Sequence, residues 1–266
     1  ETLETEEERM SILMRIVTII TGAALFLTPV FISKMTADAI CEGVVINLAD
    51  SSKHQFVTNN DIMNALRATG IRVTGQKIRD IPLTKLEERV KAFTELRVAE
   101  VYISEDRKLH VYGNQREPVM RVMASYGGDF FIDREGVIMR RHNLYTPNLH
   151  ILEIDMVFNS EQMTGTNIFE SEKTANLAQA FELVNYIRGD SFWNGMIDQL
   201  SMSRDGRVTL VPHVGNHTVK MGRVENYEEK LHNLRVFYRQ AMPVAGWDRY
   251  RVINVEYKGQ VVCQRR

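Results

Sequence analysis

The longest apolar run of the chain extends from Ile16 to Ile32 and contains no charged residue. As a helix, its 17 residues span about 25 Å, and the apolar residues 12–14 extend it toward the roughly 30 Å hydrocarbon core of a bilayer. We therefore expect a transmembrane helix at residues 12–33, preceded by a cytoplasmic tail at residues 1–11. Two alternatives stay open, a buried core helix and a cleaved signal peptide ending near Ala37-Asp38-Ala39, a small-x-small pattern.

Beyond this run, the hydrophobic pattern predicts a small module in the order strand, helix, helix, strand, strand. Residues 58–61 offer N-cap side chains for a helix that ends at Gly70, and Pro82 precedes a second amphipathic helix. A polar turn at residues 105–108 joins the last two strands. The predicted strands are 44–48, 98–104 and 109–113, and the second helix is 83–93. Both helices can bury their apolar stripes on one face of a three-stranded sheet.

After Pro118 the pattern changes to short strands with two longer helices, and the chain as a whole is predicted to be α+β. The tetrapeptide Asp133-Arg134-Glu135-Gly136 predicts a hairpin turn between strands 130–132 and 137–139. Further strands are predicted at 151–157, 196–202, 207–211 and 217–221, and helices at 175–188 and 227–241. The last segment predicts a terminal hairpin, with strands 252–257 and 260–263 around Lys258-Gly259.

Composition narrows the function classes. The 266 residues carry a formal net charge of −1, so the chain has no basic field that would hold nucleic acid. Its two cysteines, Cys41 and Cys263, could pair in an oxidising compartment, but two unpaired thiols are the simpler interpretation.

A search for catalytic or ligand-binding motifs gives no convincing set, and we predict neither enzyme activity, metal nor cofactor. His213 and His217 have the spacing of a helical zinc pair, but Pro212 and Gly215 favour a loop, and a third ligand is lacking nearby. Ser125 lies near Gly127-Gly128 without the pattern of a nucleophile elbow, and no phosphate-binding loop is present.

Several motifs resemble one known family. Residues 83–93, 98–103 and 109–111, followed by Gln115-Arg116-Glu117-Pro118, are similar to a POTRA domain and more narrowly to that of the FtsQ/DivIB cell-division proteins. The Phe131–Gly136 segment, the phrase Gly246-Trp247-Asp248-Arg249-Tyr250 and residues 253–263 resemble the same family, most closely its Bacteroidetes-type members. The resemblance implies a POTRA-like βααββ domain at 42–115 and an FtsQ-type β domain with two helices at 116–266.

The resemblance also implies a function. FtsQ proteins are single-pass inner-membrane proteins of the division septum whose periplasmic domains bind the anchored partners FtsB and FtsL. Carried onto this chain, the partner-pairing strand is Gln260, Val261, Val262 and Cys263, with Tyr257 as a nearby aromatic anchor. Other readings stay open: these residues merely complete the sheet, or the chain is a POTRA-bearing secretion or outer-membrane assembly component, or an anchored envelope enzyme.

Overall fold

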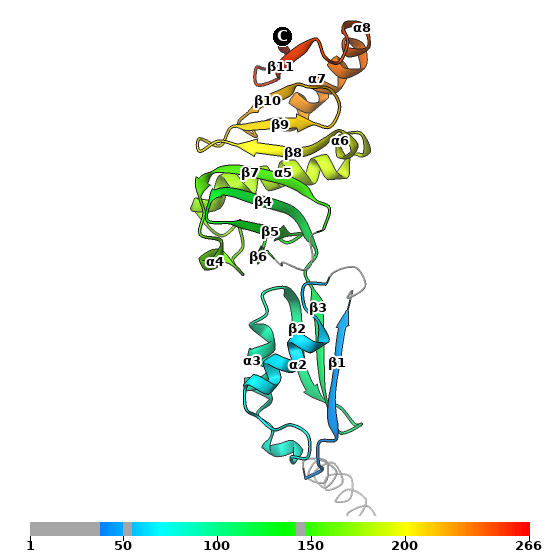
Figure 1. Ribbon diagram of the computed structural model, residues 1–266, viewed down its shortest axis with the longest axis vertical. Helices are drawn as coiled ribbons and strands as arrows, with labels where there is room; N and C mark the ends of the chain where they lie inside the picture. Colours follow the sequence, from blue (N-terminus) through cyan, green and yellow to red (C-terminus); the bar gives the residue numbers. More distant parts are fainter. Residues whose placement is uncertain (1–37, 50–54, 142–146) are drawn as a thin grey trace, which may run out of the picture. The chain divides into compact units, whose positions relative to one another are not determined.

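A computed structural model describes residues 38–49, 55–141 and 147–266, which form two compact units (Figure 1). The first unit holds the described residues up to Ala49, together with Thr58–Ala92 and Val98–Gly113, and the second holds the others. The predicted transmembrane helix at 12–33 lies outside the described residues. Within the described part of the chain, no helix is both long and apolar enough to span a bilayer.

The first unit has the predicted order of elements. Its helices are α2 (Asn59–Ala68) and α3 (Leu83–Lys91), with a short 3₁₀ helix η1 (Ile78–Asp80), and its sheet has the order β1-β3-β2. The strands are β1 (Gly43–Ala49), β2 (Leu96–Ile103) and β3 (Lys108–Gln115). Thr58 caps α2 as expected, because its hydroxyl accepts from the Asp61 N–H and its own N–H donates to the Asp61 carboxylate.

The second unit contains a nine-stranded sheet in the order β12-β11-β10-β9-β8-β7-β4-β5-β6. Its strands are β4 (Pro118–Tyr126), β5 (Asp129–Asp133), β6 (Ile138–Arg140), β7 (His150–Val157), β8 (Ile197–Met202), β9 (Val208–Pro212), β10 (Thr218–Gly222), β11 (Tyr250–Asn254) and β12 (Val262–Arg265). Its helices are α4 (Ser160–Met163), η2 (Glu172–Thr174), α5 (Ala175–Gly189), α6 (Ser191–Met196), α7 (Tyr227–Gln240) and α8 (Met242–Ala245). The two predicted helices are α5 and α7, while the short helices and β4 were not predicted.

Parallel pairing builds the centre of this sheet. Strand β7 pairs in parallel with both β4 and β8, and β10 pairs in parallel with β11. Such pairs need a crossover connection. Helix α5 supplies it between β7 and β8, and α7 supplies it between β10 and β11 (Figure 1), whereas strands β5 and β6 lie between β4 and β7 in the chain. The hairpins β5–β6 and β8–β9 are antiparallel, as predicted.

In strands β8 to β11 one face of the sheet carries the core, whereas consecutive residues of β5 and β6, such as Phe130 and Phe131, are buried on both faces. Inward residues such as Leu200, Leu210 and Ile253 are fully buried, whereas their neighbours along the strands are more exposed. The predicted apolar face of α5 and Leu231 and Leu234 of α7 pack into the same cluster. Each fully buried leucine contributes about 1.5–3 kcal/mol of transfer free energy, so the helices fix the sheet through this face.

The terminal hairpin forms, but its strand boundaries differ from the predicted ones. Strand β11 ends at Asn254 rather than Tyr257, and β12 begins at Val262, so Gln260 and Val261 precede the strand. The Asn254 side-chain oxygen accepts from the Glu256 N–H at 2.8 Å, which replaces a ladder partner at this point. The alternating pattern Val255-Glu256-Tyr257 therefore belongs to a loop.

Candidate partner-binding edge

The sheet has two outer strands, and the chain itself covers one of them. At β6, the N–H of Ile138 donates to the carbonyl of Thr166 at 2.9 Å, and the N–H of Gly165 donates to the carbonyl of Ile138 at 2.8 Å. The N–H of Ile168 donates to the carbonyl of Gly136 at 2.9 Å beside this strand. The backbone of residues 165–168 thus bonds Ile138 of β6 and Gly136 just before it on the outer side of the sheet.

The opposite outer strand, β12, pairs with β11 on one side, and no described strand pairs with it on the other. Its outward groups follow from the register. The Val255 N–H donates to the Lys220 carbonyl of β10 at 2.9 Å. Backbone groups of alternate residues point to the same neighbouring strand, so those of Ile253 point toward β10 and those of Asn254 toward β12.

Asn254 lies opposite Val262, and Ile253 lies opposite Cys263. By alternation, the backbone groups of Val262 and Gln264 point toward β11, while the N–H and C=O of Cys263 point away from the sheet. Cys263 is therefore the centre of the unpaired row that an incoming strand would meet.

The side chains of β12 alternate between the two faces. Cys263 lies on the same face as Ile253 and packs against the core, and burial raises the pKa of its thiol. Val262 points to the other face and is 47% exposed. Both cysteines are free thiols, with Cys41 buried in the first unit.

The remaining predicted site residues lie in the loop before β12. Tyr257 is 56% exposed, and its carbonyl accepts from the Gln260 N–H at 3.2 Å, which closes a turn around Lys258-Gly259. Val261 packs partly against the core. The structure therefore brings Val262 and Cys263 to the edge, and places the other three in an adjoining loop.

An ion pair that sequence reasoning missed holds this loop. The Arg207 guanidinium contacts the Glu256 carboxylate, and this hydrogen bond is the main cause of the raised pKa of Arg207. Gly222 makes room for the pair, because a Cβ there would lie 2.6 Å from Cγ of Glu256. No local pattern reveals a contact between residues 49 positions apart.

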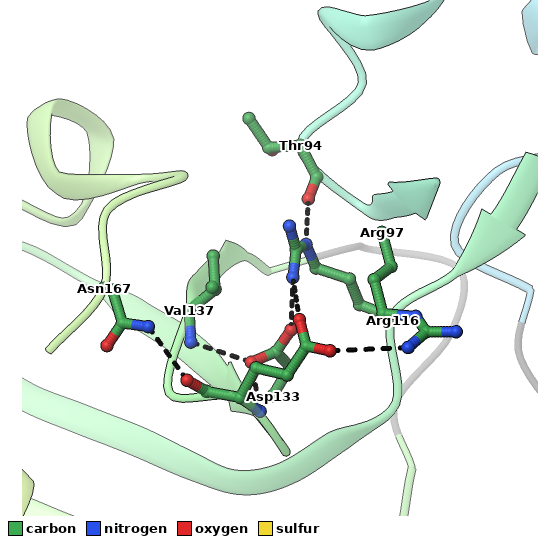
Figure 2. Close-up of polar contacts among 7 residues, drawn as sticks. Thr94, Arg97, Arg116, Asp133, Val137 and Asn167 are labelled. Atoms are coloured by element: carbon green, nitrogen blue, oxygen red, sulfur yellow. Dashed lines mark hydrogen bonds and ion pairs between the residues drawn. The ribbon is translucent and has the colours of Figure 1, made fainter. Parts of the chain in front are cut away.

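The motif residues that carried the family resemblance meet in a second polar cluster (Figure 2). The Arg116 guanidinium donates to the Asp133 carboxylate at 2.6 Å and to the Thr94 carbonyl at 3.0 Å. Asp133 also accepts from the N–H groups of Glu135 and Val137 at 2.9 and 2.7 Å, so it fixes the β5–β6 turn. We call these contacts the Arg116–Asp133 clamp.

Gln115, the residue before Arg116, also makes long-range hydrogen bonds. Its side-chain oxygen accepts from the N–H groups of Phe56 and Val57 at 2.9 and 3.0 Å, although these residues are almost 60 positions away. The Gln-Arg-Glu-Pro and Asp-Arg-Glu-Gly motifs are thus explained by structural contacts within the second unit.

The two histidines with metal-like spacing do not converge. His217 is buried and its Nε2 lies 2.7 Å from the hydroxyl of Tyr238, whereas His213 is exposed beside Asp198. Burial, and after it the charge of Arg266, lowers the pKa of His217. Across the described ranges, no group of three or more His, Cys, Asp or Glu side chains is placed to hold a metal.

The described residues thus comprise a small α/β unit followed by a large sheet whose outer strand β12 pairs with β11 alone. Residues 39–112 match the POTRA-like domain family, and residues 117–264 match the family described as FtsQ/DivIB, C-terminal related. The chain belongs to the FtsQ/DivIB family, whose members are non-enzymatic scaffolds of cell division. A comparison with curated proteins gave no significant match.

Proposed function

We propose that this chain is a single-pass scaffold of the division septum that binds membrane-anchored partners of the FtsB and FtsL type. In this proposal residues 12–33 anchor it in the inner membrane, and both described units lie in the periplasm. The partner contributes a β-strand that pairs with the outer side of β12.

The observation that carries the proposal is the difference between the two outer strands of the large sheet. Backbone bonds from residues 165–168 cover Ile138 of β6 and the adjoining Gly136, whereas β12 directs the N–H and C=O of Cys263 outward. Native sheets usually protect such edges, and an edge left open is a template for another chain. The family membership makes a division partner the expected occupant.

The loop before β12 supplies a side-chain contact for that partner. Tyr257 is exposed on a turn that is held by the Asn254–Glu256 hydrogen bond and the Arg207–Glu256 ion pair. Little rotational freedom of the backbone is then lost when a partner packs on its ring. Exposed aromatic residues held in this way often dominate the energy of an interface.

Co-purification tests the identity of the partners. Tagged full-length protein, extracted from membranes in mild detergent, is expected to recover FtsB- and FtsL-like proteins, and its depletion is expected to give filamentous cells. Recovery of outer-membrane assembly proteins, with normal septation after depletion, would refute the proposal.

Backbone pairing is tested on the recovered partner segment. Synthetic copies of that segment are methylated at the backbone nitrogens of alternate residues, in two complementary sets. Only the set whose N–H groups face β12 is expected to lose binding, because its donors are removed. Equal binding of both sets would exclude strand pairing at this edge.

A further inference from the structure

The charge of the chain is unevenly distributed around β12. The whole sequence has a formal net charge of −1, but residues 248–266 contain five cationic side chains and two anionic ones. The cations are Arg249, Arg251, Lys258, Arg265 and Arg266, and the anions are Asp248 and Glu256. This last segment of the second unit is therefore locally positive by three charges.

The strand register gathers the four arginines of this segment at one end of the β11–β12 pair. Arg265 lies opposite Tyr250, and the Arg266 N–H donates to the Arg249 carbonyl at 3.3 Å. The register shifts between Tyr250 and Val252, so Arg251 is the extra residue of a bulge. We call Arg249, Arg251, Arg265 and Arg266 the arginine end of the edge.

The nearby carboxylates leave most of this charge uncompensated. Glu256 is engaged by Arg207, and Asp248 accepts a hydrogen bond from the side chain of Asn216 at 3.3 Å. Among the described residues, no carboxylate lies within ion-pair distance of Arg249, Arg251 or Arg265, and all three are exposed.

The other end of the same edge is apolar. Val262 begins β12 and is 47% exposed, and Tyr257 lies on the loop just before it. Val262 and Arg265 are three positions apart, or about 10 Å along a strand. A strand added to β12 thus meets an apolar contact at one end and guanidinium groups at the other.

We propose that the partner strand is acidic at one end: it places an apolar side chain beside Val262 and an Asp or Glu beside Arg265, about three positions away. This inference rests on the proposed pairing at β12. The carboxylate contacts guanidinium groups that are exposed, so its main effects are on the association rate and on the choice of partner. The same charges disfavour a basic strand on this edge.

The test selects strands without assuming the partner. A random 12-residue peptide library is selected against the full 266-residue protein in detergent. The variant Arg265→Glu is compared with Lys85→Glu, which makes the same charge change on α3 of the first unit. Selected peptides are then resynthesised with alternate backbone N-methylation and titrated at low and high salt.

We expect enriched peptides to carry Asp or Glu about three positions from an aliphatic or aromatic residue. Arg265→Glu should weaken them about 3- to 10-fold and flatten their salt dependence, while Lys85→Glu should leave both unchanged. Methylation-sensitive peptides that lack this acidic preference, or that respond equally to the two variants, would overturn the inference and leave strand pairing intact. If no selected peptide is sensitive to alternate methylation, strand pairing at β12 fails, and the inference fails with it.

Discussion

The Arg116–Asp133 clamp makes a quantitative prediction about stability. Asp133 is only 1% exposed, and Arg116 supplies its ion-pair partner at 2.6 Å (Figure 2). Removing one partner of a buried ion pair costs about 3–5 kcal/mol. Asp133 keeps two backbone N–H donors, and Arg116 is 15% exposed, so water can replace part of the contact. We therefore expect Arg116→Met to lower the free energy of unfolding of the second unit by about 2–4 kcal/mol.

The chain offers both a probe and a matched control for this measurement. Its two tryptophans, Trp193 and Trp247, lie in the second unit, so tryptophan fluorescence during urea unfolding follows that unit. Arg97 pairs with Glu135 at 3.4 Å, a carboxylate that Arg116 also contacts at 3.4 Å, but the Arg97 and Glu135 side chains are about half exposed. Arg97→Met should therefore stay within about 1 kcal/mol of the wild type.

A double-mutant cycle separates the pair from the bulk of the side chains. Asp133→Asn keeps an oxygen that accepts the backbone N–H groups, so in combination with Arg116→Met it removes the charge that was left unpaired. We expect the double variant to be more stable than the sum of the single effects by at least about 1 kcal/mol. Additive effects, or a loss in Arg116→Met no larger than in Arg97→Met, would refute the clamp.

Three further predictions concern the region around β12. Burial lowers the pKa of His217 below its ordinary 6.5, so the unfolded state binds more protons than the folded state. The urea midpoint should therefore fall as the pH drops below about 6.5, and His217→Gln should reduce this fall. An unchanged pH dependence in this variant would contradict the prediction. Gly222 has a φ of 70°, and the Cβ of Gly222→Ala would displace Glu256. The variant should therefore destabilise the second unit by about 1–2 kcal/mol and weaken partner binding. Unchanged urea unfolding together with an unchanged pull-down would refute the role of Gly222 in placing Glu256. Val261→Pro removes a backbone donor next to β12, so it should weaken partner binding about 2- to 10-fold in a pull-down, while Val261→Thr should not. If Val261→Pro binds the partner as tightly as the wild type, with its fold intact by circular dichroism, the result would argue against edge pairing.

The sequence predicts the elements of this fold better than their connections. Strong local signals, such as the Thr58 cap and the apolar face of α5, correspond to observed helices. Strand β4 was missed because its sequence, Pro118–Tyr126, mixes apolar, basic and small residues without a regular alternation. Parallel pairing was also missed, because it joins strands that other elements separate in the sequence: α5 for β7–β8, α7 for β10–β11, and the strands β5 and β6 for β4–β7.

The sequence likewise predicts the hairpin of the candidate site, but not the exact end of its first strand or its long-range contacts. The alternating apolar residues near the chain end place a hairpin there, but the side chain of Asn254 ends its first strand early by bonding the Glu256 N–H. The Arg207–Glu256 pair and the Arg116–Asp133 clamp join distant segments, so their charges look like ordinary surface residues in the sequence. The arginine end likewise depends on the register of β11 and β12.

Residue-resolved amide hydrogen exchange tests the central claim most directly. In the free protein, the Cys263 N–H should exchange fast, while the N–H groups of Val262 and Gln264, which point toward β11, should be protected. Addition of an FtsB–FtsL-type complex should slow exchange at Cys263 and leave its two neighbours little changed. A Cys263 amide that is already protected in the free protein, or that exchanges equally fast in the complex, would contradict a partner strand on β12.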